Sequence, residues 1–240
     1  MSKIAKDFFA GCKDRTPEVR ESGGKPVLEL PVKDALQFID LPQPAALEQP
    51  QYDLTQAIVN RKSLREFSPE KISLAELAYL LWCTQGVKEN KEGKVTFRTV
   101  PSAGCRHVFN TYLLVQNVEG LKPGLYRYIA LEHKLALLND DAALTGKIAD
   151  CCVTPMPMKN SAVSFLWTGY IYRMTSRYGI AGMRFMLLDA GHVCQNLYLS
   201  ALAVGCGACA LGGFKDEEIN ALLGLDEEQH TIYIAAVGKE

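Results

Sequence analysis

Residues 184–204 read RFMLLDAGHVCQNLYLSALAV, the longest stretch of this chain in which apolar side chains recur at helical spacing. These apolar positions cover much of the circumference of the expected helix, and they are Leu187, Leu188, Val193, Cys194, Leu197, Tyr198, Ala201 and Leu202. Small residues at 190, 191, 200 and 201 would let neighbouring elements approach its backbone closely. Because a helix that is apolar on so many sides must be covered by other elements, we expect it to lie at the centre of the fold.

Short β-rich and helical stretches precede and follow this helix. Residues 111–118, 124–130 and 134–138 are β-rich runs joined by short turns, which predicts an antiparallel meander. Further strands are expected at 162–167, 205–214 and 231–237, and further helices at 74–86, 142–152, 170–177 and 216–223. Asp53 and Ser73 are expected N-caps, each with Gln or Glu three residues later, and Gly224 ends the last helix. The pattern predicts an α+β fold.

Residues 1–50 differ from the rest because prolines break them into short pieces. The prolines are Pro17, Pro26, Pro31, Pro42, Pro44 and Pro50. We interpret residues 1–50 as an extended proline-rich N-terminal arm with one short helix near residues 32–39, followed by a main domain over residues 51–240. The apolar side chains of the arm must pack on the chain's own body or on a partner subunit, and a disordered arm is the alternative.

Composition and charge narrow the class of protein. The chain has 240 residues, of which 48% are apolar and 22% charged, and its net charge is −1. Because its basic residues are scattered, we expect neither a nucleic-acid partner nor a membrane surface. The first twenty residues lack a continuous apolar run typical of a signal peptide, so we expect a cytoplasmic protein. Its eight cysteines are irregularly spaced, which favours reduced and mostly buried thiols.

The stretch RKSLREF at residues 61–67 gathers unusual charge just after an expected helix. Arg61, Lys62 and Arg65 place three cations within five residues, with the hydroxyl of Ser63 between them. Arginine presents a rigid fork of donors that suits phosphate oxygens, and lysine adds a point charge. We interpret this stretch as an anion-binding clamp. The alternative is a solvated basic helix end that interacts favourably with the helix dipole.

Two other stretches allow a ligand to approach the backbone. The sequence Pro101-Ser102-Ala103-Gly104 has only small side chains after its proline, and Gly212-Gly213 can expose backbone N–H groups. Either could instead be a plain turn. Cys206 and Cys209 spell C-x-x-C, but no second pair or suitably spaced histidine accompanies them, so we expect no metal site.

Five motifs in this order resemble the nitroreductase family of FMN oxidoreductases. They are RKSLREF, PSAG, DAGHVCQNLYLSA, LGGF and a terminal strand that ends in AVGK. Within that family, the stretches GLYRY at 124–128 and RYG at 177–179 are similar to the branch of azoline dehydrogenases that form thiazoles and oxazoles in peptides. The resemblance covers about residues 51–240. It implies a nitroreductase-like fold, with a central, mostly antiparallel sheet flanked by helices, in an intertwined homodimer.

The resemblance also implies roles for individual residues. Arg61, Ser63 and Arg65 would hold the phosphate, ribityl chain and pyrimidine edge of FMN, with Lys62 beside them. Residues lining the flavin from the partner subunit would be Pro101, Ser102, Ala103, Gly104 and Cys105; Cys105 stands where many relatives have asparagine. Gly212 and Gly213 would lie near the reactive face of the flavin, and Lys239 would add a phosphate contact. The long helix would form the core of the dimer.

Arg177 and Tyr178 stand where azoline dehydrogenases carry a catalytic Lys-Tyr pair. A guanidinium stays protonated and does not act as a general base as a tuned lysine does, whereas Tyr178 can still donate a proton. We therefore expect an FMN-dependent oxidoreductase that uses NAD(P)H to reduce nitroaromatic, quinone or similar small-molecule acceptors by a ping-pong mechanism. The alternatives are a flavin-dependent dehydrogenase of a peptide azoline or other heterocycle, a catalytically silent flavin-binding partner subunit, and a structural dimer without cofactor.

Overall fold

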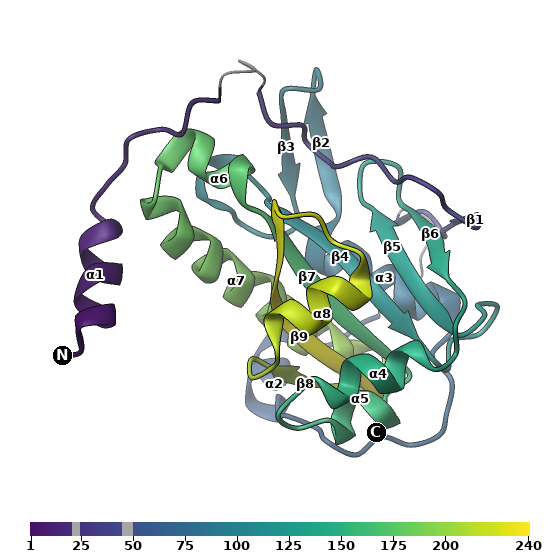
Figure 1. The fold of residues 1–240 in the computed structure, drawn as a ribbon. Helices are drawn as coiled ribbons and strands as arrows, with labels where there is room; N and C mark the ends of the chain where they lie inside the picture. Colours follow the sequence, from purple (N-terminus) through teal and green to yellow (C-terminus); the bar gives the residue numbers. More distant parts are fainter. Residues whose placement is uncertain (21–24, 45–49) are drawn as a thin grey trace.

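The computed structural model describes residues 1–20, 25–44 and 50–240. Its main sheet has seven strands in the order β1-β6-β5-β4-β7-β9-β8, and each neighbouring pair is antiparallel. The strands are β1 Gln37–Asp40, β4 Phe109–Val115, β5 Gly124–Ile129, β6 Lys134–Asn139, β7 Val163–Tyr170, β8 Cys206–Leu211 and β9 Gln229–Lys239. The predicted meander is confirmed as β4, β5 and β6. The predicted α+β fold, with a central antiparallel sheet flanked by helices, is also confirmed (Figure 1).

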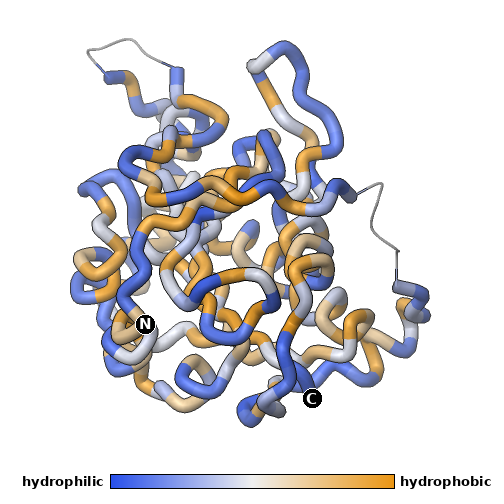
Figure 2. The backbone as a smooth tube through the Cα atoms, turned by 90° about the vertical axis from the view of Figure 1, so that its right-hand side faces the viewer, coloured by the Kyte–Doolittle hydropathy of each residue, from blue (hydrophilic) through white to orange (hydrophobic). Residues whose placement is uncertain are grey.

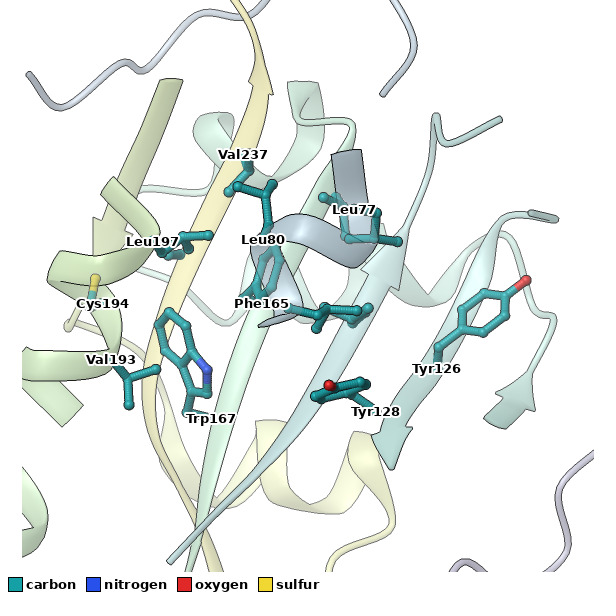
Figure 3. Packing of buried hydrophobic residues seen from close by; sticks show 14 of the residues in the cluster. Leu77, Leu80, Tyr126, Tyr128, Phe165, Trp167, Val193, Cys194, Leu197 and Val237 are labelled. Atoms are coloured by element: carbon teal, nitrogen blue, oxygen red, sulfur yellow. The ribbon is translucent and has the colours of Figure 1, made fainter. Parts of the chain in front are cut away.

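Helices cover both faces of this sheet. The α-helices are α1 Lys3–Gly11, α2 Leu54–Asn60, α3 Leu74–Gln85, α4 Leu144–Asp150, α5 Met156–Asn160, α6 Ile171–Tyr178, α7 Ala181–Ala203 and α8 Asp216–Leu223, and of these α1 does not lie on the sheet. One apolar core lies between the sheet and α3 and α7, and a second lies between the sheet and α4, α5 and α8. Figure 3 shows side chains of α3, α7 and β7 meeting in the first core, among them Leu80, Leu197 and Trp167. Helix α7 therefore packs on the sheet as its pattern predicts.

The local signals at the helix ends are confirmed. The carboxylate of Asp53 accepts a hydrogen bond from the Gln56 N–H at the start of α2. Ser73 and Glu76 form a complete capping box at the start of α3. Gly224 follows α8 in the left-handed conformation with φ of 66°. These short-range contacts require no information from the rest of the chain, so the sequence predicts them well.

The helix predicted near residues 32–39 is wrong. This segment has no helix: it bends at residues 34 and 36 and then enters β1, which pairs with β6 at the edge of the main sheet. Val32, Phe38 and Ile39 favour a strand, and the free edge of β6 supplies the backbone hydrogen bonds that a local helix would otherwise make. The arm thus packs on the chain's own body here, with Leu41 buried in the first core. The division into an arm and a domain at residue 50 stays a prediction.

Some elements were not predicted from the sequence. Helix α1 stands apart from the body beside α7 (Figure 1). The others are the short helix α5 and the hairpin of β2 Val87–Lys91 and β3 Val95–Arg98. Figure 2 shows that hydrophobic segments gather inside the molecule, while many loops at its periphery are hydrophilic. Within the described part of the chain, no helix is both long and apolar enough to cross a membrane.

Candidate functional site

The predicted clamp lies between the end of α2 and strand β8. The backbone of Ser63 bridges to Ala208 of β8, and the Leu64 N–H donates to the Ala208 carbonyl at 2.9 Å. Gly207 lets the chain approach this closely, because a Cβ there would lie 2.5 Å from the Leu64 side chain. Residues 61–65 are therefore fixed along β8 by their backbone.

The side chains of the clamp surround Tyr198 of α7. The Ser63 hydroxyl lies 3.0 Å from the Tyr198 hydroxyl, which also accepts a hydrogen bond from the Ala210 N–H at 2.8 Å. The Arg61 guanidinium lies 5.4 Å from the centre of the Tyr198 ring, which is cation–π range. Arg65 donates to the Ser63 carbonyl at 3.4 Å. The cluster therefore places the Arg61 guanidinium and the Ser63 hydroxyl at Tyr198, and the Arg65 guanidinium at the Ser63 backbone.

Neither Arg61 nor Arg65 belongs to an ion pair within the described residues. Arg61 is half-buried and Arg65 is exposed. Unpaired guanidinium groups held beside a hydroxyl form a donor set that suits a phosphate group. These residues therefore fit the anionic end of a flavin nucleotide.

The two lysines of the predicted site are engaged differently. Lys62 is exposed and its Nζ lies 3.7 Å from a Glu240 carboxylate oxygen. The Nζ of Lys239 donates to Glu76 at 2.5 Å and to the Val204 carbonyl at 2.8 Å. Burial acts to lower the pKa of Lys239, but the hydrogen bond to Glu76 and the nearby negative charges, that of Glu76 among them, together outweigh it and raise the pKa. Lys239 is thus already held by its own chain.

Gly212 and Gly213 follow directly on β8 and are exposed. The Gly213 carbonyl accepts a hydrogen bond from the Val153 N–H at 2.9 Å. The clamp lies beside the same strand, because Ser63 bridges to Ala208 of β8. The structure thus places the clamp and the Gly212-Gly213 turn along one strand.

The segment from Pro101 to Cys105 is a tight loop held by Asp189 of α7. The Ser102 hydroxyl donates to Asp189 at 2.6 Å, and the Ala103 N–H donates to it at 3.2 Å. Burial raises the pKa of Asp189, against the opposing effect of these two hydrogen bonds. Gly104 and Cys105 both have φ of 55°, a left-handed conformation that costs free energy for a cysteine. The loop is therefore a strained turn with a buried anchor.

Arg177 and Tyr178 end helix α6 against this loop. A Cβ added to Gly104 would lie 2.4 Å from the Tyr178 hydroxyl and 3.2 Å from Arg177 Nε. The Tyr178 ring packs edge-on against Phe185, with ring centres 5.0 Å apart. The structure thus brings together two candidate groups, Pro101 to Cys105 and Arg177-Tyr178, that are distant in the sequence.

The predicted site residues consequently form two separate groups within one chain. The first surrounds Tyr198 and β8, and the second surrounds Asp189. These two residues lie nine positions apart on α7, which is about 13 Å along a helix axis. Sequence reasoning did not assign roles to Asp189 or Tyr198, although a carboxylate inside an apolar helical pattern was a signal for the first.

The cysteines and histidines contribute no further group to this site. All eight thiols are free, and six of them are buried, as predicted. Burial raises the pKa of Cys206 to about 12, so this thiol of the C-x-x-C stretch stays protonated and packs in the first core. Among the described residues, no three His, Cys, Asp or Glu side chains come together as metal ligands would.

The model of the nitroreductase family matches residues 58–239. A protein of Methanocaldococcus jannaschii that is named as a nitroreductase is 29% identical over 187 residues, which is 78% of this chain and 91% of that protein. A solved structure from Ralstonia eutropha, also named as a nitroreductase, has a TM-score of 0.67 and 26% identity, and the match covers 90% of this chain and 97% of that one.

The fold also matches a chain of the E. coli microcin synthetase McbBCD complex, which was solved with truncated pro-MccB17 bound. That match has a TM-score of 0.62 and 18% identity, and it covers 99% of this chain and 92% of that one. At this identity the likeness shows the fold alone. It includes the N-terminal arm, whereas the family model begins at residue 58.

Two further matches are to longer proteins. The trifolitoxin-processing protein TfxB of Rhizobium leguminosarum is 25% identical over 203 residues, which is 76% of this chain but 54% of that protein. A structure from Anabaena variabilis named as a nitroreductase has a TM-score of 0.70 and 24% identity, and the match covers 85% of this chain but 41% of that one. This chain thus spans about half of these longer proteins.

Proposed function

Because the chain belongs to the nitroreductase family, we propose that it is an FMN-dependent oxidoreductase that uses NAD(P)H to reduce nitroaromatic, quinone or similar acceptors. The family match confirms the resemblance drawn from the five motifs. The single observation that carries the proposal is the pair of guanidinium groups, Arg61 and Arg65, held beside the Ser63 hydroxyl without a carboxylate partner in the described structure. These groups would hold the phosphate and the pyrimidine edge of FMN.

FMN would supply two-electron chemistry, and the protein would bind and orient it. Backbone N–H groups of Gly212 and Gly213 are exposed next to the clamp and would face the flavin. The Tyr178 hydroxyl, which lies at the Gly104 backbone, would hold or deliver a proton to the acceptor. A single pocket would serve NAD(P)H and the acceptor in turn, which gives ping-pong kinetics.

We further propose that the working protein is a homodimer with FMN at the subunit interface. Two observations support this. Leu187 and Leu188 of α7 are 52% and 56% exposed, so the central helix has an apolar face that its own chain leaves uncovered. The two groups of site residues also lie apart in one chain, and a second copy would bring the loop of residues 101–105 to the clamp. The eight free thiols support a reducing, cytoplasmic setting.

The experiment that tests this function is the visible absorption spectrum of the purified protein, followed without oxygen after NADPH or NADH is added. A flavin band that bleaches supports an active reductase and identifies its electron donor. A flavin band that neither nicotinamide changes would contradict the proposed donor. Absence of flavin after incubation with FMN would contradict the assignment of the clamp.

A second candidate function is oxidation of a peptide azoline or another heterocycle. It is favoured by the position of Arg177-Tyr178 against the 101–105 loop and by the relative that is named as a trifolitoxin-processing protein. Arginine in place of lysine argues against a general base at this position. A precursor peptide and a cyclodehydratase encoded beside this protein would favour this candidate, and flavin bleaching by the peptide rather than by NAD(P)H would establish it. Bound flavin without turnover would indicate a silent flavin-binding subunit.

A further inference from the structure

The N-terminal arm, the tip of the β2–β3 hairpin and α6 enclose a pocket that the proposed function does not use. Its volume is about 800 Å³, within the range of pockets that bind small organic molecules. Apolar side chains of the arm, such as Val19 and Leu28, line part of it. Its cationic lining residues are Arg20, Lys25, Lys94, Arg106 and Arg177. The pocket therefore combines apolar walls with a concentration of positive charge.

This positive charge is only partly compensated. Arg20 pairs with Glu228 at 2.5 Å, and Lys94 pairs with Glu92 at 2.6 Å. Glu18 is the one carboxylate among the described lining residues, and it already accepts hydrogen bonds from Thr175 and Arg20. Five cations therefore face three carboxylates in a chain whose net charge is −1. Such a local excess of one sign attracts ligands of the opposite sign.

Arg106 is the clearest unused group in the pocket. It is half-buried, and its Nε is a buried donor without a hydrogen-bond partner. Burial lowers the pKa of Arg106, and the neighbouring positive charge of Arg177 lowers it further. Neither guanidinium takes part in an ion pair of the described structure. The charge of this half-buried guanidinium is therefore uncompensated by the described residues, and an anionic ligand would compensate it.

The arm wall of the pocket is fixed to α6. The Glu18 N–H donates to the Thr175 carbonyl at 3.0 Å, and Arg173 Nε donates to the Val27 carbonyl at 2.9 Å. The Arg20 guanidinium lies 3.5 Å from the centre of the Tyr172 ring. These contacts hold the described stretches of the arm on this side of the pocket, residues 17–20 and 25–28, against α6 before any ligand binds.

We propose that this pocket binds an organic dianion, a small molecule that carries two carboxylate or phosphate groups, and that the N-terminal arm selects it. Arg106 and Arg177 would each hold one anionic group by paired N–H donors. Arg177 also lies against Gly104, so the bound molecule would reach the loop predicted to line the flavin. Only this last placement rests on the proposed function, because anion binding in the pocket does not require FMN.

The test is a calorimetric titration of the full-length protein with three probes: inorganic pyrophosphate, isophthalate as an aromatic dicarboxylate, and neutral benzamide. We expect the anions, but not benzamide, to bind, and to bind more weakly at high ionic strength. Arg106→Gln and Lys25→Gln should each weaken anion binding, the first by about tenfold, as expected for one charge-assisted hydrogen bond. The matched control is Lys71→Gln, which removes an exposed cation outside the pocket.

The outcomes separate this proposal from the proposed function. Stronger binding of pyrophosphate would identify a phosphate ligand, and stronger binding of isophthalate would identify a carboxylate ligand; both support the pocket. Affinity that falls with Arg61→Ala but not with Arg106→Gln or Lys25→Gln would place the anion at the clamp and overturn the proposal. No anion binding would also overturn it, whether or not the protein binds FMN.

Discussion

The two groups of site residues use their polar atoms in opposite ways. In the loop group, Asp189 is buried and accepts hydrogen bonds from Ser102 and Ala103 within the same chain. In the clamp group, Arg61 and Arg65 are fixed by backbone contacts, but their charges have no carboxylate partner in the described residues. The loop is therefore completed by the fold itself, while the clamp is left to be completed by a ligand. Substitutions should therefore lower the stability of the protein in the loop group and its affinity for the ligand in the clamp group.

The largest effect on stability is expected from Asp189→Ala. This change removes a buried acceptor that two half-buried donors share, so the free energy of unfolding should fall by about 3 kcal/mol. Urea unfolding followed by tryptophan fluorescence measures it. The matched control is His192→Ala on the exposed side of the same helix, for which we expect less than about 0.5 kcal/mol. Equal losses in both variants would mean that Asp189 does not anchor the loop.

Arg61→Ala tests the clamp, because it should weaken FMN binding while it leaves the stability of the protein nearly unchanged. Loss of a charge-assisted phosphate contact should weaken FMN binding by about 30- to 150-fold, or 2–3 kcal/mol, while urea unfolding of the FMN-free protein stays nearly unchanged. Fluorescence titration with FMN measures the affinity. Lys62→Ala is the comparison, because Lys62 is exposed and lies near Glu240, so its effect should be smaller. Full flavin affinity in Arg61→Ala would refute the clamp assignment.

Gly104→Ala sharpens the contrast within the loop group. The alanine would have to adopt φ of 55°, and its Cβ would lie 2.4 Å from the Tyr178 hydroxyl. We therefore expect the free energy of unfolding to fall by about 1–2 kcal/mol. Gly120→Ala is the control, because Gly120 also has a positive φ but has open space around it. A smaller loss in Gly120→Ala would show the contribution of the contact with Tyr178. Identical losses would mean that the clash is relieved at no cost.

The structural features that were predicted correctly are those that residues close together in the sequence determine. The caps at Asp53 and Ser73 and the meander of β4 to β6 depend on short-range hydrogen bonds and on the alternation of apolar residues, and they are confirmed. The helix predicted near 32–39 failed because β1 pairs with β6, about one hundred residues away along the chain. Pairing of that kind leaves no local signal in the sequence, so propensity alone assigned the segment to the wrong class.

The candidate site shows the same limit. The motif that contains Arg61, Ser63 and Arg65 was visible because its charges are adjacent in the sequence. The contact of Ser102 with Asp189 joins residues 87 positions apart, and the Tyr198 hydroxyl meets Ser63 across 135 positions. Both Asp189 and Tyr198 looked like parts of a central helix. Their polar contacts emerge only when α7 packs beside the loop and β8.

The smallest change in stability is expected at Lys239, the predicted clamp residue whose charge is already paired with a carboxylate of its own chain. Lys239 pairs with Glu76. Burial acts to raise the pKa of Glu76, but the hydrogen bonds from Lys239 and Ser73 and the charge of Lys239 together outweigh it and lower the pKa. A carboxylate with a lowered pKa stabilises the fold above about pH 4.3, the ordinary value for glutamate, and this contribution is lost as the pH falls further.

Glu76→Gln keeps an acceptor for the capping box but removes the charge. We expect a loss of about 1 kcal/mol at pH 7, after allowance for solvent screening, and a difference from the wild type that shrinks below about pH 4.3. Urea unfolding at pH 7 and pH 3.5 measures both values. The same variant releases Lys239, so FMN should bind more tightly if this lysine contacts the phosphate. An unchanged FMN affinity would remove Lys239 from the predicted clamp and leave Arg61 and Arg65 as its cations.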